Sequence, residues 1–295
     1  MKRFTIKHIF CTVLLGIFLM QTQFAQVGIG TVTPRGALDI GSNSYGIVYP
    51  RVALTANNVQ TPVVNPNGGN IVEGTMVYNT TQTMNATNNV YPGIYAWNGT
   101  KWAPQFIMEE YKKYSQTGGC QRTTIRESNG NPNPNDDENI AGLTNQTFTP
   151  KYSGTYKVEV RANFGAGELI DFTNLDAISL ATSEGAFFFT MSGLGVDIDP
   201  TSSTYDYTEG WLYTHSYATH NSNTAPAQQD NTKLHNSALV YHLELVGGTT
   251  YNFNFSICIT TGHTYFLNNG DSGNGQGHVG HDRPCTVEFT FLKEN

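Results

Sequence analysis

Charged side chains are scarce in this sequence: Asp, Glu, Lys and Arg make up only 13% of its 295 residues. Acidic residues outnumber basic ones, 23 against 16, so the surface would repel phosphate groups and anionic lipids. The sequence also lacks an apolar run of about 20 residues, the length that a membrane-spanning helix requires. We therefore expect neither nucleic acid binding nor membrane insertion.

The longest apolar run lies near the amino terminus and has the layout of a secretory signal. Lys2, Arg3 and Lys7 precede the apolar residues 9–20, and a polar stretch follows that ends at Ala25-Gln26. This order is typical of a cleaved signal peptide. We expect residues 1–25 to be removed and the mature protein to be secreted or displayed on the cell surface.

Cysteine is also sparse, and only Cys120, Cys258 and Cys285 lie beyond the signal. Exported chains meet an oxidising environment, so three cysteines suggest one disulfide and one leftover thiol. Cys258 ends one strand-like run and Cys285 begins another, which makes this pair the predicted disulfide. Three buried and reduced thiols are the alternative, because spacing does not define which cysteines pair.

Asparagine, threonine, glycine, serine and tyrosine are abundant, as suits short β-strands joined by many turns. Residues 26–104 contain only short strand-like runs, so we expect a small β-rich stalk or head region with a thin core. The pair Asn98-Gly99 between Trp97 and Trp102 predicts a tight hairpin that brings the two indoles together.

The carboxyl-terminal part, residues 119–295, alternates apolar and polar residues in several runs. Tyr156, Val158 and Val160 point one way and the charged residues between them point the other, which is the period of a half-buried strand. Similar runs begin near Leu239, Tyr251 and Val287. About eight such strands, and no helix long enough for a crossover, predict an all-β, antiparallel jelly-roll sandwich.

A short helical neck is expected between the two β regions, over residues 105–118. Ile107, Tyr111 and Tyr114 follow helical spacing, and Glu109 and Lys113 form an i, i+4 pair. A helix of about three turns is marginal alone. It would pack either within one chain or against copies of itself in a trimer.

Two resemblances to known families extend this interpretation. The phrases Val27-Gly-Ile-Gly-Thr-Val-Thr-Pro34, Leu38-Asp-Ile40, Pro50-Arg-Val-Ala-Leu54 and Tyr95-Ala-Trp-Asn-Gly-Thr-Lys-Trp102 resemble the amino-terminal region of exported bacterial fibre-like or adhesin-like proteins. That resemblance implies a surface location and a trimeric or fibrous habit.

The second resemblance is looser and covers residues 119–295. Phe148-Thr-Pro-Lys-Tyr-Ser-Gly-Thr-Tyr-Lys-Val158 and Leu243-Glu-Leu-Val-Gly-Gly-Thr-Thr-Tyr251 look like phrases of the complement globular-head and tumour-necrosis-factor jelly rolls. The sequence departs from that pattern at Val158, where an aromatic is usual, and in inserts around residues 171–184 and 216–233. Those families are trimers that bind protein or carbohydrate through their loops, so the resemblance implies a homotrimer.

Candidate metal ligands and nucleophiles are few. His278, His281 and Asp282 lie within five residues, so they are the candidate zinc ligands, although histidines that cap a surface turn are the default explanation. Calcium would instead use loop carboxylates, namely Asp271, Asp282, or Asp136 with Asp137 and Glu138. No cofactor is otherwise expected.

The string Gly270-Asp271-Ser272-Gly273 looks like the nucleophile phrase of chymotrypsin-type proteases, but no matching histidine phrase lies upstream. A glycine-rich loop explains this string without any catalytic role. We therefore predict a protein without enzymatic activity.

Aromatic residues are the candidate ligand-binding groups. Trp97 with Trp102, or Trp211 with Tyr213, would form a stacking platform for sugar rings, unless alternation buries them in a core. The function predicted from sequence is a trimeric surface protein, adhesin-like or fibre-like, that binds a glycan or protein through its loops. A monomeric carbohydrate-binding module or glycan-active enzyme, and a purely structural assembly subunit, are the alternatives.

Overall fold

The computed structural model describes residues 26–85, 87–123, 137–170, 178–193, 211–223, 228–230, 233–261, 265–267 and 276–294. The predicted signal peptide lies outside the described residues. The chain divides into two compact units, Met1–Tyr49 and Pro50–Asn295. None of the described residues forms an α-helix, so this part of the chain contains no helix long and apolar enough to cross a membrane. The all-β fold class is confirmed.

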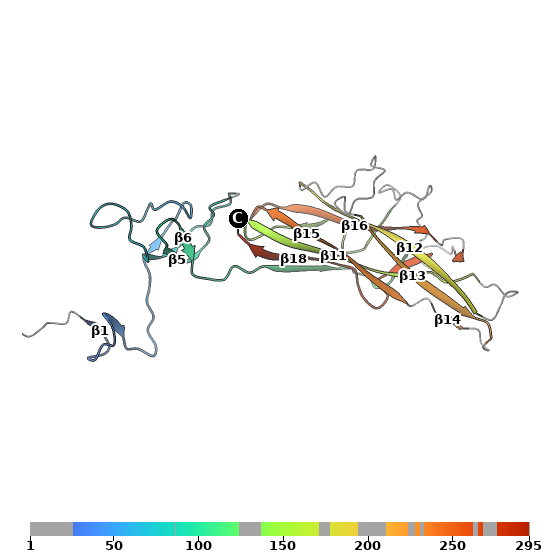
Figure 1. Cartoon of the computed structure of the whole chain (residues 1–295), viewed down its shortest axis with the longest axis horizontal. Helices are drawn as coiled ribbons and strands as arrows, with labels where there is room; N and C mark the ends of the chain where they lie inside the picture. The colour runs from blue at the N-terminus through green and yellow to red at the C-terminus, as the bar shows by residue number, and fades with distance from the viewer. Residues whose placement is uncertain are drawn as a thin grey trace, which may run out of the picture. The chain divides into compact units, whose positions relative to one another are not determined.

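Figure 1 shows the strands in chain order. They are β1 (Val27–Ile29), β2 (Leu38–Ile40), β3 (Arg51–Val52), β4 (Met76–Asn79), β5 (Gly93–Trp97), β6 (Trp102–Pro104), β7 (Tyr111–Ser115), β8 (Gln121–Thr123), β9 (Glu138–Asn139), β10 (Gln146–Phe148), β11 (Gly154–Ala166), β12 (Ile178–Met191), β13 (Trp211–Asn221), β14 (Gln228–Asp230), β15 (Leu234–Leu245), β16 (Tyr251–Thr261), β17 (Gly277–Val279) and β18 (Thr286–Lys293).

The first unit contains one small sheet, in which β1 and β2 pair in parallel. The second unit begins with a four-stranded sheet of order β3-β4-β5-β6. The hairpin β5-β6 turns at Asn98 and Gly99, where the glycine adopts a φ of 92° that other residues rarely adopt. Trp97 and Trp102 face each other across it, with ring centroids 5.4 Å apart, as the sequence predicts.

The rest of the second unit is a sandwich of two six-stranded sheets. One sheet has the order β7-β18-β11-β17-β8, with β15 also pairing β11, and the other has the order β10-β16-β12-β13-β14, with β9 also pairing β16. All of these pairs are antiparallel. The prediction of about eight strands falls short of these twelve because β7 lies where a helix was expected, and because β9, β14 and β17 have only two or three residues, too few for alternation to reveal.

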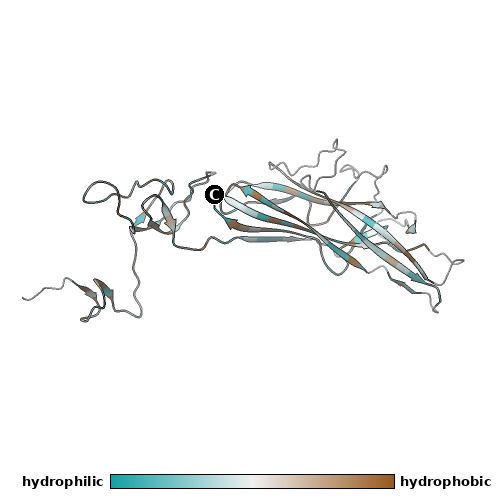
Figure 2. Ribbon diagram, viewed as in Figure 1, coloured by the Kyte–Doolittle hydropathy of each residue, from teal (hydrophilic) through white to brown (hydrophobic). Residues whose placement is uncertain are grey.

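The strand β11 lies at the centre of its sheet, with β15 on one side and β18 on the other. Tyr156, Val158 and Val160 are completely buried in the core between the sheets. On the outer face Glu159 binds the side chains of Lys157 and Arg161. The alternation predicted for this strand is therefore confirmed, and the ribbon coloured by hydropathy shows it along the long strands (Figure 2).

The predicted helical neck over residues 105–118 is wrong, because strand β7 occupies its centre and pairs with β18. Tyr114 packs its ring against Phe253 and Phe289 of the sandwich core. Lys113 forms its ion pair with Glu288 across the sheet, at 3.3 Å, rather than with a residue one helical turn away. A three-turn helix is marginal, whereas pairing with β18 satisfies the backbone and buries an aromatic ring.

The stacked pair Phe148 and Phe289 provides a test of the core. Their ring centroids lie 4.0 Å apart and Phe289 is completely buried. We expect Phe289→Ala to lower the free energy of unfolding by about 3–5 kcal/mol, since it leaves a cavity. Leu292→Ala, on the same strand but 48% exposed, should change it by less than about 0.5 kcal/mol. Urea denaturation would measure both, and equal effects would contradict this core assignment.

Candidate functional site

The two tryptophans predicted to form a stacking platform lie in the core of the four-stranded sheet β3-β4-β5-β6. Trp97 is 3% exposed and Trp102 is completely buried, in a core that also contains Leu54, Val77 and Tyr95. The indole Nε1 of Trp102 donates a hydrogen bond of 2.9 Å to a backbone carbonyl. In the single chain these two rings therefore form a core and offer no face to a sugar.

The second predicted aromatic pair lies on β13. Tyr213 is half-buried and packs against Ala186 and Phe188 on the outer side of the sheet. Trp211 begins the same strand, and the arrangement of its side chain lies outside the described part of the structure. Binding of a ligand by Trp211 and Tyr213 stays a prediction.

The predicted metal ligands lie on and after β17. His278 is completely buried, its ring centroid is 5.6 Å from that of His281, and His281 contacts Asp282 at 3.1 Å between Nδ1 and Oδ1. Among the residues that the structure describes, no group of three His, Cys, Asp or Glu side chains is placed to hold a metal ion. Of the carboxylates considered for calcium, Asp137 instead accepts a hydrogen bond from the Ser256 hydroxyl.

Other predicted positions lie outside the described residues or make different contacts. Asp136 and the string from Gly270 to Gly273 lie outside them. Glu138, on β9, accepts a hydrogen bond of 2.9 Å from the side-chain amide of Gln121, on β8, so it links the two sheets of the sandwich.

The predicted disulfide between Cys258 and Cys285 is wrong, because Cys285 is a free and buried thiol. The neighbours of Cys258 on β16 belong to the sandwich core, so alternation turns its own side chain to the outer face, against Phe188. Cys285 lies in the core, where its Sγ accepts a hydrogen bond from the Asn163 amide at 3.3 Å. Cys120 is free and exposed.

Exposed apolar side chains concentrate in the amino-terminal third of the chain. Within the described residues, seventeen large hydrophobic side chains are exposed, and only four of them lie beyond residue 111. The first unit has no buried residue among those described, so it has no core of its own. The thirteen exposed hydrophobic side chains up to residue 111 are Val27, Ile29, Val32, Leu38, Tyr45, Ile47, Val48, Val59, Val64, Val72, Met84, Ile107 and Tyr111.

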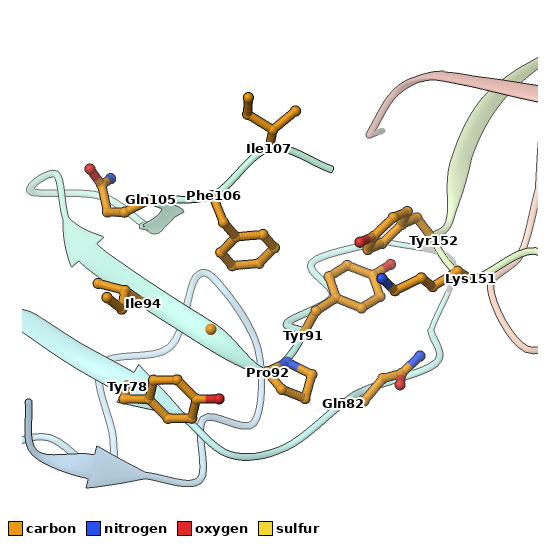
Figure 3. Close-up of a pocket in the computed structure, with 11 residues that line it drawn as sticks. Tyr78, Gln82, Tyr91, Pro92, Ile94, Gln105, Phe106, Ile107, Lys151 and Tyr152 are labelled. Atoms are coloured by element: carbon orange, nitrogen blue, oxygen red, sulfur yellow. The ribbon is translucent and has the colours of Figure 1, made fainter. Parts of the chain in front are cut away.

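A cavity of about 560 Å³ lies within the second unit, between the four-stranded sheet and the β10-β11 loop (Figure 3). Figure 3 shows the rings of Tyr91, Phe106 and Tyr152 beside this space, with Lys151 at one side. The Lys151 Nζ lies 4.8 Å from the centroid of the Tyr152 ring. Sequence reasoning missed this site, because it assigned Phe106 to a helix and left the loop tyrosines unassigned.

Hydrogen bonds hold the tyrosine wall of the cavity in place. The Tyr91 hydroxyl accepts a hydrogen bond of 2.9 Å from the Ser153 amide, and the Tyr95 hydroxyl accepts one of 2.9 Å from the Tyr91 amide. The rings of Tyr91 and Tyr152 meet edge to face at 4.9 Å. Burial raises the pKa of Tyr95 to about 12, so this hydroxyl stays neutral at physiological pH.

A carboxyl group close to these tyrosines is partly removed from water. Burial raises the pKa of Glu294 above its ordinary value of 4.5, and the charge of Lys101 lowers it by less. A carboxyl whose pKa is higher in the folded state stabilises the fold when protonated. That contribution is complete below the unfolded pKa and disappears as pH rises through the folded value.

Glu294→Gln tests this assignment, because glutamine carries no charge at any pH. At pH 7 we expect the variant to melt at a temperature higher than the parent protein by on the order of 1–2 °C, a small shift because Glu294 is only partly buried. The difference should vanish as the pH falls to about 4. The control is Glu73→Gln, on an exposed carboxyl. A gain that is the same at both pH values would contradict the assignment.

Comparison with known proteins bears on the amino-terminal third alone. No curated protein matches the chain. Residues 28–117 match a family model described as a phage tail like trimerisation region, and this segment contains most of the exposed apolar side chains described above.

Proposed function

We propose that this chain is the subunit of a homotrimeric, fibre-like assembly protein. In this proposal the amino-terminal third associates with two further copies, and the sandwich is the part that each copy displays. The observation that carries the proposal is that exposed apolar side chains concentrate in the segment that matches a trimerisation region.

Physical reasoning supports association through this segment. Complete burial of a large aliphatic side chain contributes about 1.5–3 kcal/mol, so covering several half-exposed ones contributes on the order of 1 kcal/mol each. Monomeric proteins rarely leave contiguous apolar patches in water. The sandwich differs, since its large apolar side chains fill a core shared by its two sheets.

The finer part of the proposal concerns location and ligand. With residues 1–25 acting as a signal peptide, the trimer is exported and works outside the cell as an adhesin-like binder of glycan or protein. Three weak sites on one particle act together through raised effective concentration. A purely structural subunit is the alternative.

Association in threes is tested by the mass of the mature protein in solution. Light scattering during size-exclusion chromatography should give about three times the mass of one chain, because the apolar surface of the amino-terminal third is then shared by three copies. A single-chain mass across the micromolar range would contradict the proposal.

Ligand binding is tested by a glycan array probed with the wild-type protein and two lysine variants. If the cavity binds a sugar, Lys151→Ala should reduce binding by about tenfold, because it removes a charged donor at the cavity wall. Lys233→Ala, on an exposed lysine that does not line the cavity, should leave binding unchanged. An array without signal would favour a protein ligand or a purely structural subunit.

A further inference from the structure

The small parallel sheet of the first unit has one entirely aliphatic face. In the β1-β2 register Val27 pairs with Leu38 and Ile29 pairs with Ile40. Alternate residues of a strand share a face, and paired residues of neighbouring strands do too, so these four side chains point the same way. We call Val27, Ile29, Leu38 and Ile40 the aliphatic quartet.

The opposite face of this sheet has a different chemistry. It carries Gly28, which lacks a side chain, and Asp39, whose carboxylate accepts hydrogen bonds from the Arg35 guanidinium at 3.0 Å and from its backbone amide at 2.9 Å. The hydrogen bonds from the Arg35 side chain and backbone lower the pKa of Asp39, so this pair is ionised and compensated at neutral pH. The sheet therefore presents an uncharged apolar face and a polar one.

The aliphatic quartet is left largely uncovered. Val27, Ile29 and Leu38 are 55%, 54% and 58% exposed, and Ile40 is half-buried. Parallel sheets normally occur with both faces covered, and a sheet of two short strands is marginal in water. A stable β1-β2 sheet therefore requires something apolar against the quartet.

We infer that the aliphatic quartets of three copies pack together and form the seam of the trimer, an inference that rests on the proposed function. The matched trimerisation region begins at residue 28, within β1. An uncharged aliphatic face complements itself, so three copies can meet around a threefold axis without unpaired polar groups. The Arg35–Asp39 ion pair lies on the outer side, where water solvates it.

Val27→Asp tests this seam, with Val240→Asp as the matched control. Val240 lies on β15 and is 51% exposed, close to the exposure of Val27, but it belongs to the sandwich and not to the quartet. A buried carboxylate in the seam should raise the concentration at which the trimer dissociates at least about tenfold. The control should dissociate at the same concentration as the parent, as measured by sedimentation equilibrium.

The outcomes separate this inference from the proposed function. A monomeric parent protein would overturn both. A trimeric parent whose Val27→Asp variant dissociates at the same concentration would overturn the seam alone. The thermal transition of the sandwich should be unchanged in both variants, since neither residue belongs to its core.

Cysteine cross-linking gives a second and independent measurement in the full chain. In a Cys120→Ser background, Ile29→Cys should form disulfide-linked dimers on mild oxidation, because equivalent side chains meet near a threefold axis. Asp39→Cys, on the opposite face of the same sheet, should remain unlinked. Equal cross-linking of the two variants, or of neither, would refute the seam.

Discussion

The sandwich depends on the burial of the inward side chains of β11 between two sheets. This strand pairs with neighbours on both sides, and its inward residues from Tyr156 to Phe164 are completely buried. Removing these side chains from water supplies the main favourable term that offsets the entropy of ordering the chain. The outer face needs only solvated ion pairs, such as those of Glu159.

The amino-terminal third also needs buried apolar surface, but a single chain buries little of it. Its four-stranded sheet has a compact core around Trp102, yet none of the described residues of the first unit is buried, and exposed aliphatic side chains extend along the whole segment. A segment of this kind gains from association, because intermolecular contact replaces the core that its short strands cannot build. The fold of this segment thus depends on self-association, because one chain alone buries too little apolar area.

Local patterns predicted the features that depend on local chemistry. Alternation identified the strands around Val158 and Leu243, and Asn98-Gly99 identified the hairpin, because both signals lie in consecutive residues. The candidate sites were harder to predict. An alternating aromatic such as Trp97 looks the same in sequence whether its strand faces a core or water, and the cavity combines residues from distant segments, among them Phe106 and Tyr152.

The sequence by itself determined the all-β class and the hairpin of the four-stranded sheet. Only the tertiary structure decided that Tyr111–Ser115 forms a strand, that the two tryptophans are buried and that Cys258 and Cys285 face different sides of a sheet. The physical reason is that a short segment adopts the conformation its neighbours stabilise. Strand β18 supplies hydrogen-bonding partners and an aromatic surface that residues 105–118 do not contain.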